Sequence, residues 1–176
     1  MSEKRQKIQR LRGKLNSDDT KIVIQTLEQI KDSGEAELIP DLIQVLEGTD
    51  VSEVNDKVLD ILNNLQAQAS VAEIVRMIRQ VEDDEVVASV LASCWKNRLD
   101  FSAHLHDLTK IFVNADFNSA LEAFTVIENA TPNVTNEDID ESMETIKNHL
   151  RSIDPGKKPL MMELIHMLEN KKNQIP

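Results

Sequence analysis

Three neighbouring residues, His104, His106 and Asp107, have side chains that commonly bind metal ions. Residues two apart point to different sides of a helix, so the two imidazoles cannot reach one ion without distorted geometry. The other histidines, His149 and His166, lie in later predicted helices, far from this cluster in the sequence. Surface histidines are therefore the favoured interpretation, and no metal site is predicted.

The sequence gives little support for a catalytic nucleophile or a phosphate-binding loop. The only cysteine, Cys94, falls on the apolar face of its predicted helix, away from a helix N-terminus and without an adjacent base, which favours a buried, inert thiol. The acidic clusters at 82–85 and 137–141 lack the ligand spacing of an EF-hand loop. Four scattered glycines cannot form a phosphate-binding loop. We therefore expect no catalytic residue and no cofactor, and we interpret the chain as a non-enzyme.

Charge limits the classes of partner. The 176 residues carry a formal net charge of −11, which opposes binding to nucleic-acid phosphates or anionic membranes. Residues 1–16 are the exception, with six basic side chains against one acidic side chain. The N-terminus lacks the apolar core of a signal peptide, and no apolar run approaches ~18 residues. These features predict a cytoplasmic protein without membrane contact.

Apolar residues recur three and four positions apart, and only 4 glycines and 5 prolines interrupt them, which predicts an all-α chain. The clearest unit spans 37–65, where two amphipathic helices are joined by a polar turn at 47–50. Asp50, Ser70, Asp116 and Thr135 are predicted N-caps of later helices. The predicted inward-facing residues of the later helices include Leu121 and Leu150.

The pattern predicts ten helices in five consecutive pairs, with equivalent positions at steps of 32 to 35 residues. Three sets of positions follow these steps: Leu42, Ile74 and Leu108; Val23, Val58, Val90 and Phe124; and the turn acids Asp50, Glu82 and Asp116. Their agreement indicates an array of helical hairpins.

The segment 38–46, followed by Asp50 and Val54, resembles a HEAT repeat. The resemblance is best over 35–66 and weaker over 70–97 and 102–130. It implies a single domain over 1–176, a right-handed α-solenoid of about five helical hairpins whose second helices line a concave surface. Residues 1–33 and 135–173 would be terminal cap hairpins around three central repeats at 35–130. The alternatives are another hairpin array or an irregular helical bundle.

The chain departs from this family in the second helices. The family usually places Arg or Lys directly after the valine of that helix, where it pairs with the turn acids of neighbouring repeats. Here those positions hold Asn55, Val87 and Leu121. The turn acids, Glu82 among them, are therefore expected to cap helices instead.

The repeat steps also predict an exposed ridge on the second helices. The candidate partner-binding residues on this ridge are Asp56, Asp60, Asn63, Ala88, Ala92, Trp95 and Val126. One interpretation is a groove with Trp95 as an aromatic anchor and small neighbours that leave room for a partner. The other, which we favour because most tryptophans are largely buried, is that Trp95 fills a gap between repeats.

The sequence thus favours a non-catalytic scaffold or adaptor that binds a protein partner on its concave face, as a monomer or weak homodimer. One alternative is a nucleic-acid-associated module that uses the basic helix at residues 1–15. Another is an accessory subunit of an enzyme. The basic helix itself is interpreted as the polar cap that the end of a repeat array requires.

Overall fold

The computed structural model describes residues 3–33, 36–130 and 133–175. Every regular element in these ranges is helical, which confirms the predicted all-α class. Short 3-10 turns at Ala36–Leu38, Ser102–His104 and Pro155–Lys157 precede three of the helices. The α-helices are α1 (Glu3–Leu15), α2 (Thr20–Ser33), α3 (Ile39–Gly48), α4 (Ser52–Asn63), α5 (Ser70–Ile78), α6 (Asp84–Lys96), α7 (Leu105–Asn114), α8 (Phe117–Ala130), α9 (Asn136–His149) and α10 (Lys158–Lys172).

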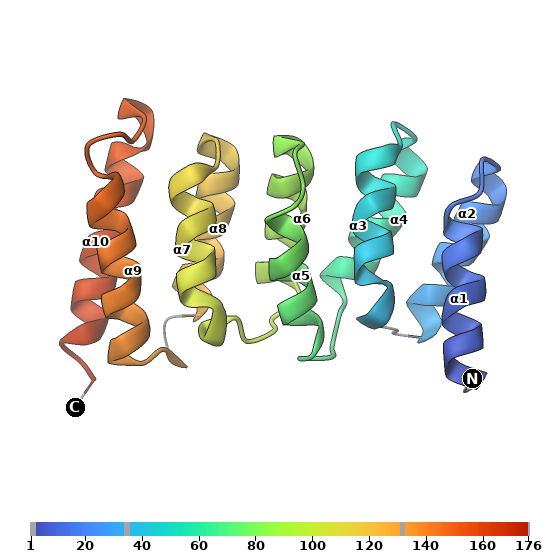
Figure 1. The fold of residues 1–176 in the computed structure, drawn as a ribbon, viewed down its shortest axis with the longest axis horizontal. Helices are drawn as coiled ribbons and strands as arrows, with labels where there is room; N and C mark the ends of the chain where they lie inside the picture. The colour runs from blue at the N-terminus through green and yellow to red at the C-terminus, as the bar shows by residue number, and fades with distance from the viewer. Residues whose placement is uncertain (1–2, 34–35, 131–132, 176) are drawn as a thin grey trace.

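Consecutive helices form pairs that stand side by side in a row, with the N-terminal and C-terminal pairs at opposite ends (Figure 1). The second helix of each pair contacts the second helices of its neighbours, so that α4 packs on α2 and α6, and α8 packs on α6 and α10. The first helices behave similarly, since α3 packs on α1 and α5, and α7 packs on α9. We call α2, α4, α6, α8 and α10 together the second-helix layer.

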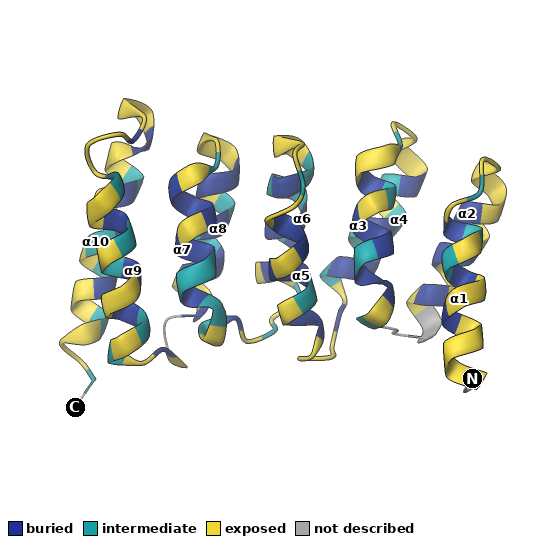
Figure 2. Ribbon diagram, viewed as in Figure 1, coloured by how far each residue is buried: buried dark blue, intermediate teal, exposed yellow. Residues whose placement is uncertain are grey.

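The core is aliphatic and continuous along the row. Buried residues lie on the faces that the helices turn toward one another, while the turns and outer faces are exposed (Figure 2). Leu27, Ile43, Leu91 and Phe112 are among the side chains with no exposed surface. Burial of one such side chain stabilises a fold by about 1.5–3 kcal/mol. A single hydrophobic cluster from Ile8 to Leu168 therefore connects the pairs.

Two predicted helix caps are confirmed. The Asp116 carboxylate accepts a hydrogen bond from the Ser119 N–H at 2.8 Å at the start of α8. At the start of α9, the Thr135 hydroxyl accepts from the Asp138 N–H at 3.2 Å, and the Asp138 carboxylate accepts from the Thr135 N–H at 2.9 Å. This reciprocal pair is a capping box, which satisfies two backbone donors that the helix itself leaves unpaired.

The prediction that Asp50 caps the helix of residues 52–63 is wrong. Helix α4 begins at Ser52, and its N-cap position is Val51, whose extended backbone carries no side-chain cap. The Thr49 hydroxyl accepts from the Val51 N–H at 3.2 Å and stabilises the turn instead. The chain stays extended one residue longer than the spacing indicated, and Asp50 therefore precedes the position from which a side chain reaches the first turn.

Two other predicted caps are displaced by one residue. Asp83, and not Glu82, caps α6, because its carboxylate accepts from the Glu85 N–H at 2.8 Å. Ser70 is already inside α5, whose N-cap is Ala69, and the buried Ser70 hydroxyl has no hydrogen-bond partner. A shift of one residue removes a side chain from capping geometry, because only the N-cap itself points back to the free N–H groups.

The step between α6 and α8 is 33 residues rather than the predicted 34. Buried positions on the two helices match at this step: Val87 with Ala120, Val90 with Ala123, and Cys94 with Ile127. An error of one residue turns a helical side chain by about 100°. Leu121, predicted to be buried, is consequently 43% exposed, and Val126, predicted on the exposed ridge, is only 1% exposed.

The C-terminal pair also differs from the prediction. Helix α9 ends at His149, and Leu150 beyond it, predicted to face inward, is 39% exposed. Helix α10 spans Lys158–Lys172. None of the helices in the described ranges combines the length and the apolar character needed to cross a membrane.

A buried lysine ties this pair to the preceding one. Lys157, just before α10, donates from Nζ to the backbone carbonyls of Phe112, Val113 and Ala115 at 3.4, 3.1 and 2.5 Å. These carbonyls lie at the C-terminal end of α7, where the helix dipole places partial negative charge. The Lys157 ammonium thus supplies the last turn of α7 with the partners that the helix lacks.

Candidate partner-binding surface

Trp95 lies near the C-terminal end of α6 and bridges to α8. Its indole Nε1 donates to the Glu122 carboxylate at 2.7 Å, and the Lys96 ammonium lies 5.4 Å from the ring centroid. The side chain is nevertheless 38% exposed. Trp95 therefore covers part of the junction between two second helices and still presents an aromatic surface to the outside.

Ala88 and Ala92 lie on the same face of α6 as Trp95, because Ala92 follows Ala88 by four residues and precedes Trp95 by three. Both alanines are half-buried. Val126 does not join them, because its burial in the core is the consequence of the corrected step between α6 and α8. Of the residues predicted to line the groove, the structure therefore places those of α6 on one face, but it does not place Val126 of α8 beside them.

The predicted polar residues of the ridge lie on α4. Asp56 is exposed, whereas the Asp60 carboxylate pairs with Lys31 Nζ on α2 at 2.6 Å. Asn63 is half-buried, and its amide oxygen has no hydrogen-bond partner although it is shielded from solvent. These three residues form an acidic and amide surface beside the α6 residues.

Sequence reasoning missed three exposed apolar residues on α8 and α10. Phe117 and Leu121, one helical turn apart, are 49% and 43% exposed, and Met162 on α10 is 58% exposed. Buried positions on α8 and α10 match at a step of 41 residues: Ala120 with Met161, Ala123 with Leu164, and Ile127 with Leu168. The steps of 33 and 41 place Ala88, Leu121 and Met162 in one row across three neighbouring helices.

We call this surface the apolar strip, and it consists of Ala88, Ala92, Trp95, Phe117, Leu121 and Met162. The spacing of Phe117 and Leu121 was the available sequence signal. It was hidden because the step of 34 placed Leu121 in the core.

The charge beside the apolar strip is uneven, because α10 has three lysines and two glutamates whereas the helices on the α4 side are acidic. Helices α4, α6 and α8 together carry seven acidic side chains and two basic ones. The two basic residues are engaged: Lys57 Nζ pairs with Glu28 at 3.1 Å, and Lys96 lies over the Trp95 ring. The seven acids are Glu53, Asp56, Asp60, Asp84, Glu85, Glu122 and Glu128.

The basic helix α1 docks through ion pairs on the first turn of α3 and on the 3-10 turn that precedes it. Arg12 Nε donates to the buried Asp41 carboxylate at 2.6 Å, and this hydrogen bond raises the pKa of Arg12. Lys4 Nζ lies 2.7 Å from the Glu37 carboxylate, and this hydrogen bond lowers the pKa of Glu37. Some of the N-terminal positive charge is therefore compensated within the fold.

His104 and His106 contact different partners, in agreement with the different sides of a helix that their spacing indicated. His106 is held by α9, with Nε2 3.0 Å from the Thr145 hydroxyl and Nδ1 3.2 Å from the Glu141 carboxylate. His104 Nδ1 lies 3.6 Å from Asp107. Among the described residues, no group of three or more His, Cys, Asp and Glu side chains is arranged to hold a metal ion.

Cys94 is buried on α6, and its thiol donates to the Val90 carbonyl at 3.3 Å. Burial raises the pKa of this thiol, because the charged thiolate is disfavoured away from water. Its position agrees with the structural role inferred from the sequence.

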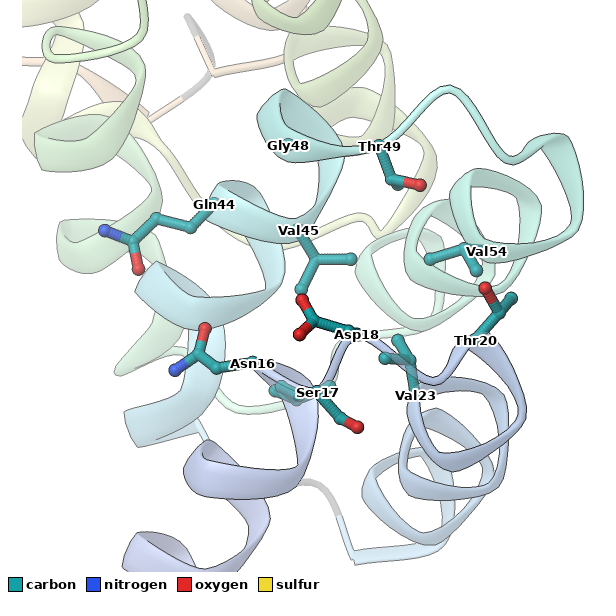
Figure 3. A pocket seen from close by; sticks show the side chains of 11 residues that line it. Asn16, Ser17, Asp18, Thr20, Val23, Gln44, Val45, Gly48, Thr49 and Val54 are labelled. Atoms are coloured by element: carbon teal, nitrogen blue, oxygen red, sulfur yellow. The ribbon is translucent and has the colours of Figure 1, made fainter.

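A hollow of about 330 Å³ opens between the α1–α2 turn and the α3–α4 hairpin (Figure 3). Its lining includes Ser17, Asp18, Gln44, Val45 and Thr49, and it contains no histidine, cysteine, lysine or arginine. Asp18 supplies the one carboxylate of the lining, beside the hydroxyls of Ser17 and Thr20. It is a gap between neighbouring turns.

Comparison of the chain with protein-family models, with curated proteins and with solved structures finds no match.

Proposed function

We propose that the chain is a non-catalytic scaffold or adaptor that binds a protein partner on its second-helix layer. The observation that carries this proposal is the apolar strip, in which Trp95, Phe117, Leu121 and Met162 are each more than a third exposed. Exposed apolar patches with polar surroundings often mark interaction sites, and tryptophan is enriched among residues that dominate binding energy.

We further propose that the architecture is a short right-handed solenoid of HEAT-like hairpins. The packing of first helices on first helices, and of second helices on second helices, supports this arrangement. In such arrays each repeat contacts mainly its neighbours, and the stacked helices build an extended surface for binding. The row of pairs, with α1 and α10 at its opposite ends, agrees with this organisation (Figure 1).

A role in nucleic-acid binding has less support. Arg12 and Lys4 pair with acidic residues of the same chain, and the second-helix layer around the apolar strip is acidic. Negative charge repels the phosphate backbone, which supplies most of the affinity in nonspecific complexes. An enzyme that uses this chain as an accessory subunit remains one form of the proposed protein partner.

Capture of partners from a lysate of the source organism tests the proposal. The tagged wild type is compared with Leu121→Ser in the apolar strip and with Leu150→Ser at the end of α9, a leucine of similar exposure outside the second-helix layer. We expect the Leu121 variant to lose partners that the wild type and the Leu150 variant retain. Equal recovery with both variants would refute the assignment of the binding surface.

A further inference from the structure

We propose that the segment bound by the apolar strip is a cationic amphipathic helix of a separate protein. This inference rests on the proposed function and specifies the chemistry of its partner. The apolar face of that helix covers Trp95 and Leu121, while its lysine or arginine side chains meet Glu122 and the neighbouring acids. Shape, charge and the state of the chain's own basic helix each support this choice.

The dimensions of the strip fit a helix. The row formed by Ala88, Leu121 and Met162 crosses three packed helices. Neighbouring helix axes are about 8–10 Å apart, so two steps span roughly 16–20 Å, which a helix of about 11–13 residues covers at 1.5 Å per residue. Apolar residues three and four apart on such a helix would lie along the row. The half-buried Ala88 and Ala92 leave a lower surface beside the Trp95 ring.

The charge on the α4, α6 and α8 side of the strip favours a basic partner. These three helices carry seven acidic side chains against two engaged lysines, whereas α10, which carries Met162, has three lysines and two glutamates. Glu122 is central, since one of its carboxylate oxygens accepts from the Trp95 indole at the edge of the exposed ring. Complementary charge accelerates association and excludes partners of the wrong sign. An acidic helix would meet repulsion on this surface.

A second copy of the chain is a poorer occupant. Its own basic amphipathic helix, α1, has the apolar residues Ile8, Leu11 and Leu15 buried against the rest of the fold. Its Arg12 also holds the buried Asp41 carboxylate. Docking α1 on another copy would require breaking these contacts, and contact between two second-helix layers would bring acid against acid.

Trp95 provides the assay, because the chain has one tryptophan and no tyrosine. The full chain is titrated with a 14-residue helical peptide of leucine and lysine, and separately with the same pattern of leucine and glutamate. We expect the lysine peptide to shift Trp95 emission to the blue, to protect it from acrylamide and to bind at least tenfold more tightly than the glutamate peptide. Equal affinities, or lysine-peptide binding that leaves Trp95 emission and quenching unchanged, would overturn the proposal.

Two variants separate specific docking from general attraction to an acidic protein. Glu122→Gln keeps an acceptor for the Trp95 indole but removes the charge, and we expect binding of the lysine peptide to weaken about two- to fivefold, as for an exposed ion pair. Leu121→Ser should weaken it about tenfold or more through lost apolar burial. Leu150→Ser, the matched control, should bind like the wild type. Wild-type affinity in both strip variants would contradict the docking site.

The outcomes distinguish this inference from the proposed function. If Leu121→Ser abolishes partner capture but the lysine peptide binds no better than the glutamate peptide, the surface is correct and the cationic helix is wrong. If Leu121→Ser changes neither partner capture nor binding of the lysine peptide, the proposed function itself is wrong. A wild-type dimer in sedimentation that Leu121→Ser dissociates would identify a second copy as the occupant and would also overturn the inference.

Discussion

Replacement of Lys157 by methionine should destabilise the fold even though it removes a buried charge. The Lys157 ammonium donates to the carbonyls of Phe112, Val113 and Ala115 at the C-terminal end of α7. Methionine has a similar length and an apolar end, so Lys157→Met leaves these acceptors without their donor and changes the side-chain volume little. The perturbation therefore tests the hydrogen bonds and the charge rather than the packing.

The magnitude follows from opposing contributions. A cation in a favourable, partly buried position at a helix C-terminus contributes up to about 2 kcal/mol, and a buried acceptor left without a partner costs about 1–3 kcal/mol. Burial lowers the pKa of Lys157, while Asp116 and Asp154 oppose this effect, so methionine also relieves the cost of keeping the ammonium away from water. We expect a net loss of about 2 kcal/mol, which corresponds to a fall of roughly 4–8 °C in Tm for a chain of this size.

Thermal unfolding followed by far-ultraviolet circular dichroism measures this effect. Lys158→Met is the matched control, because it removes the same charge from an exposed neighbour and should change stability by less than about 0.5 kcal/mol. The pKa of Lys157 is lower in the folded protein than its unfolded value of about 10.4. Between these two pKa values the unfolded chain binds more protons than the folded protein. The difference in unfolding free energy between the wild type and Lys157→Met should therefore grow as the pH rises through this interval. A Tm for Lys157→Met equal to that of Lys158→Met would refute the reasoning.

Three further predictions concern caps, pH and the core. Asp116→Ala should cost about 1 kcal/mol in urea unfolding, whereas Asp50→Ala should cost less than about 0.5 kcal/mol because Asp50 caps no helix; equal losses would contradict the cap assignment. Burial alone would raise the pKa of Asp116, but hydrogen bonds from Ser119 hold it lowered, so the advantage over Asp116→Asn should be complete above pH ~4 and disappear as the pH falls through the folded pKa. Constant differences between pH 7 and pH 2 would exclude this linkage. Leu91→Ala should lower the free energy of unfolding by about 2–5 kcal/mol and Leu121→Ala by less than about 1 kcal/mol, since only Leu91 is fully buried. A large loss of stability in Leu121→Ala would support the step of 34 residues between α6 and α8, which buries Leu121.

The helical class and most of the core were accessible from the sequence because a helix exposes one face and buries another at a fixed period. The predicted stripes of the unit at 37–65 are buried in the structure, from Leu38 and Leu42 on the first helix to Val58 and Leu62 on the second. Periodicity identifies such stripes wherever three or four apolar residues reinforce one another. This redundancy explains the success in this region.

The face that α8 turns toward the core and the residues that cap the helices were less predictable. Helix α8 contains apolar residues on several faces, so a buried stripe that included Leu121 also fitted the pattern, and an error of one residue exchanged the environments of Leu121 and Val126. Capping depends on where the extended backbone ends, which placed Val51 and Asp83 at the N-caps in place of Asp50 and Glu82. Spacing alone does not fix these backbone angles.

The candidate surface was predictable only in part. Trp95 with Ala88 and Ala92 was identified from the register of α6, and the structure places them on one face. The contribution of Met162 requires the step of 41 residues between α8 and α10, which a nearly constant repeat length cannot give. The Lys157 contacts join residues more than 40 positions apart and had no signal in the sequence.

The central claim, that the second-helix layer binds the partner, is tested most directly by site-specific photo-crosslinking in a lysate of the source organism. A benzoylphenylalanine replaces Phe117 in the apolar strip or, as a control, the exposed Lys110 on α7 in the other layer. We predict a discrete crosslinked protein from position 117, suppressed by Leu121→Ser, and none from position 110. Crosslinks from position 110 alone, or equally from both positions, would contradict the account.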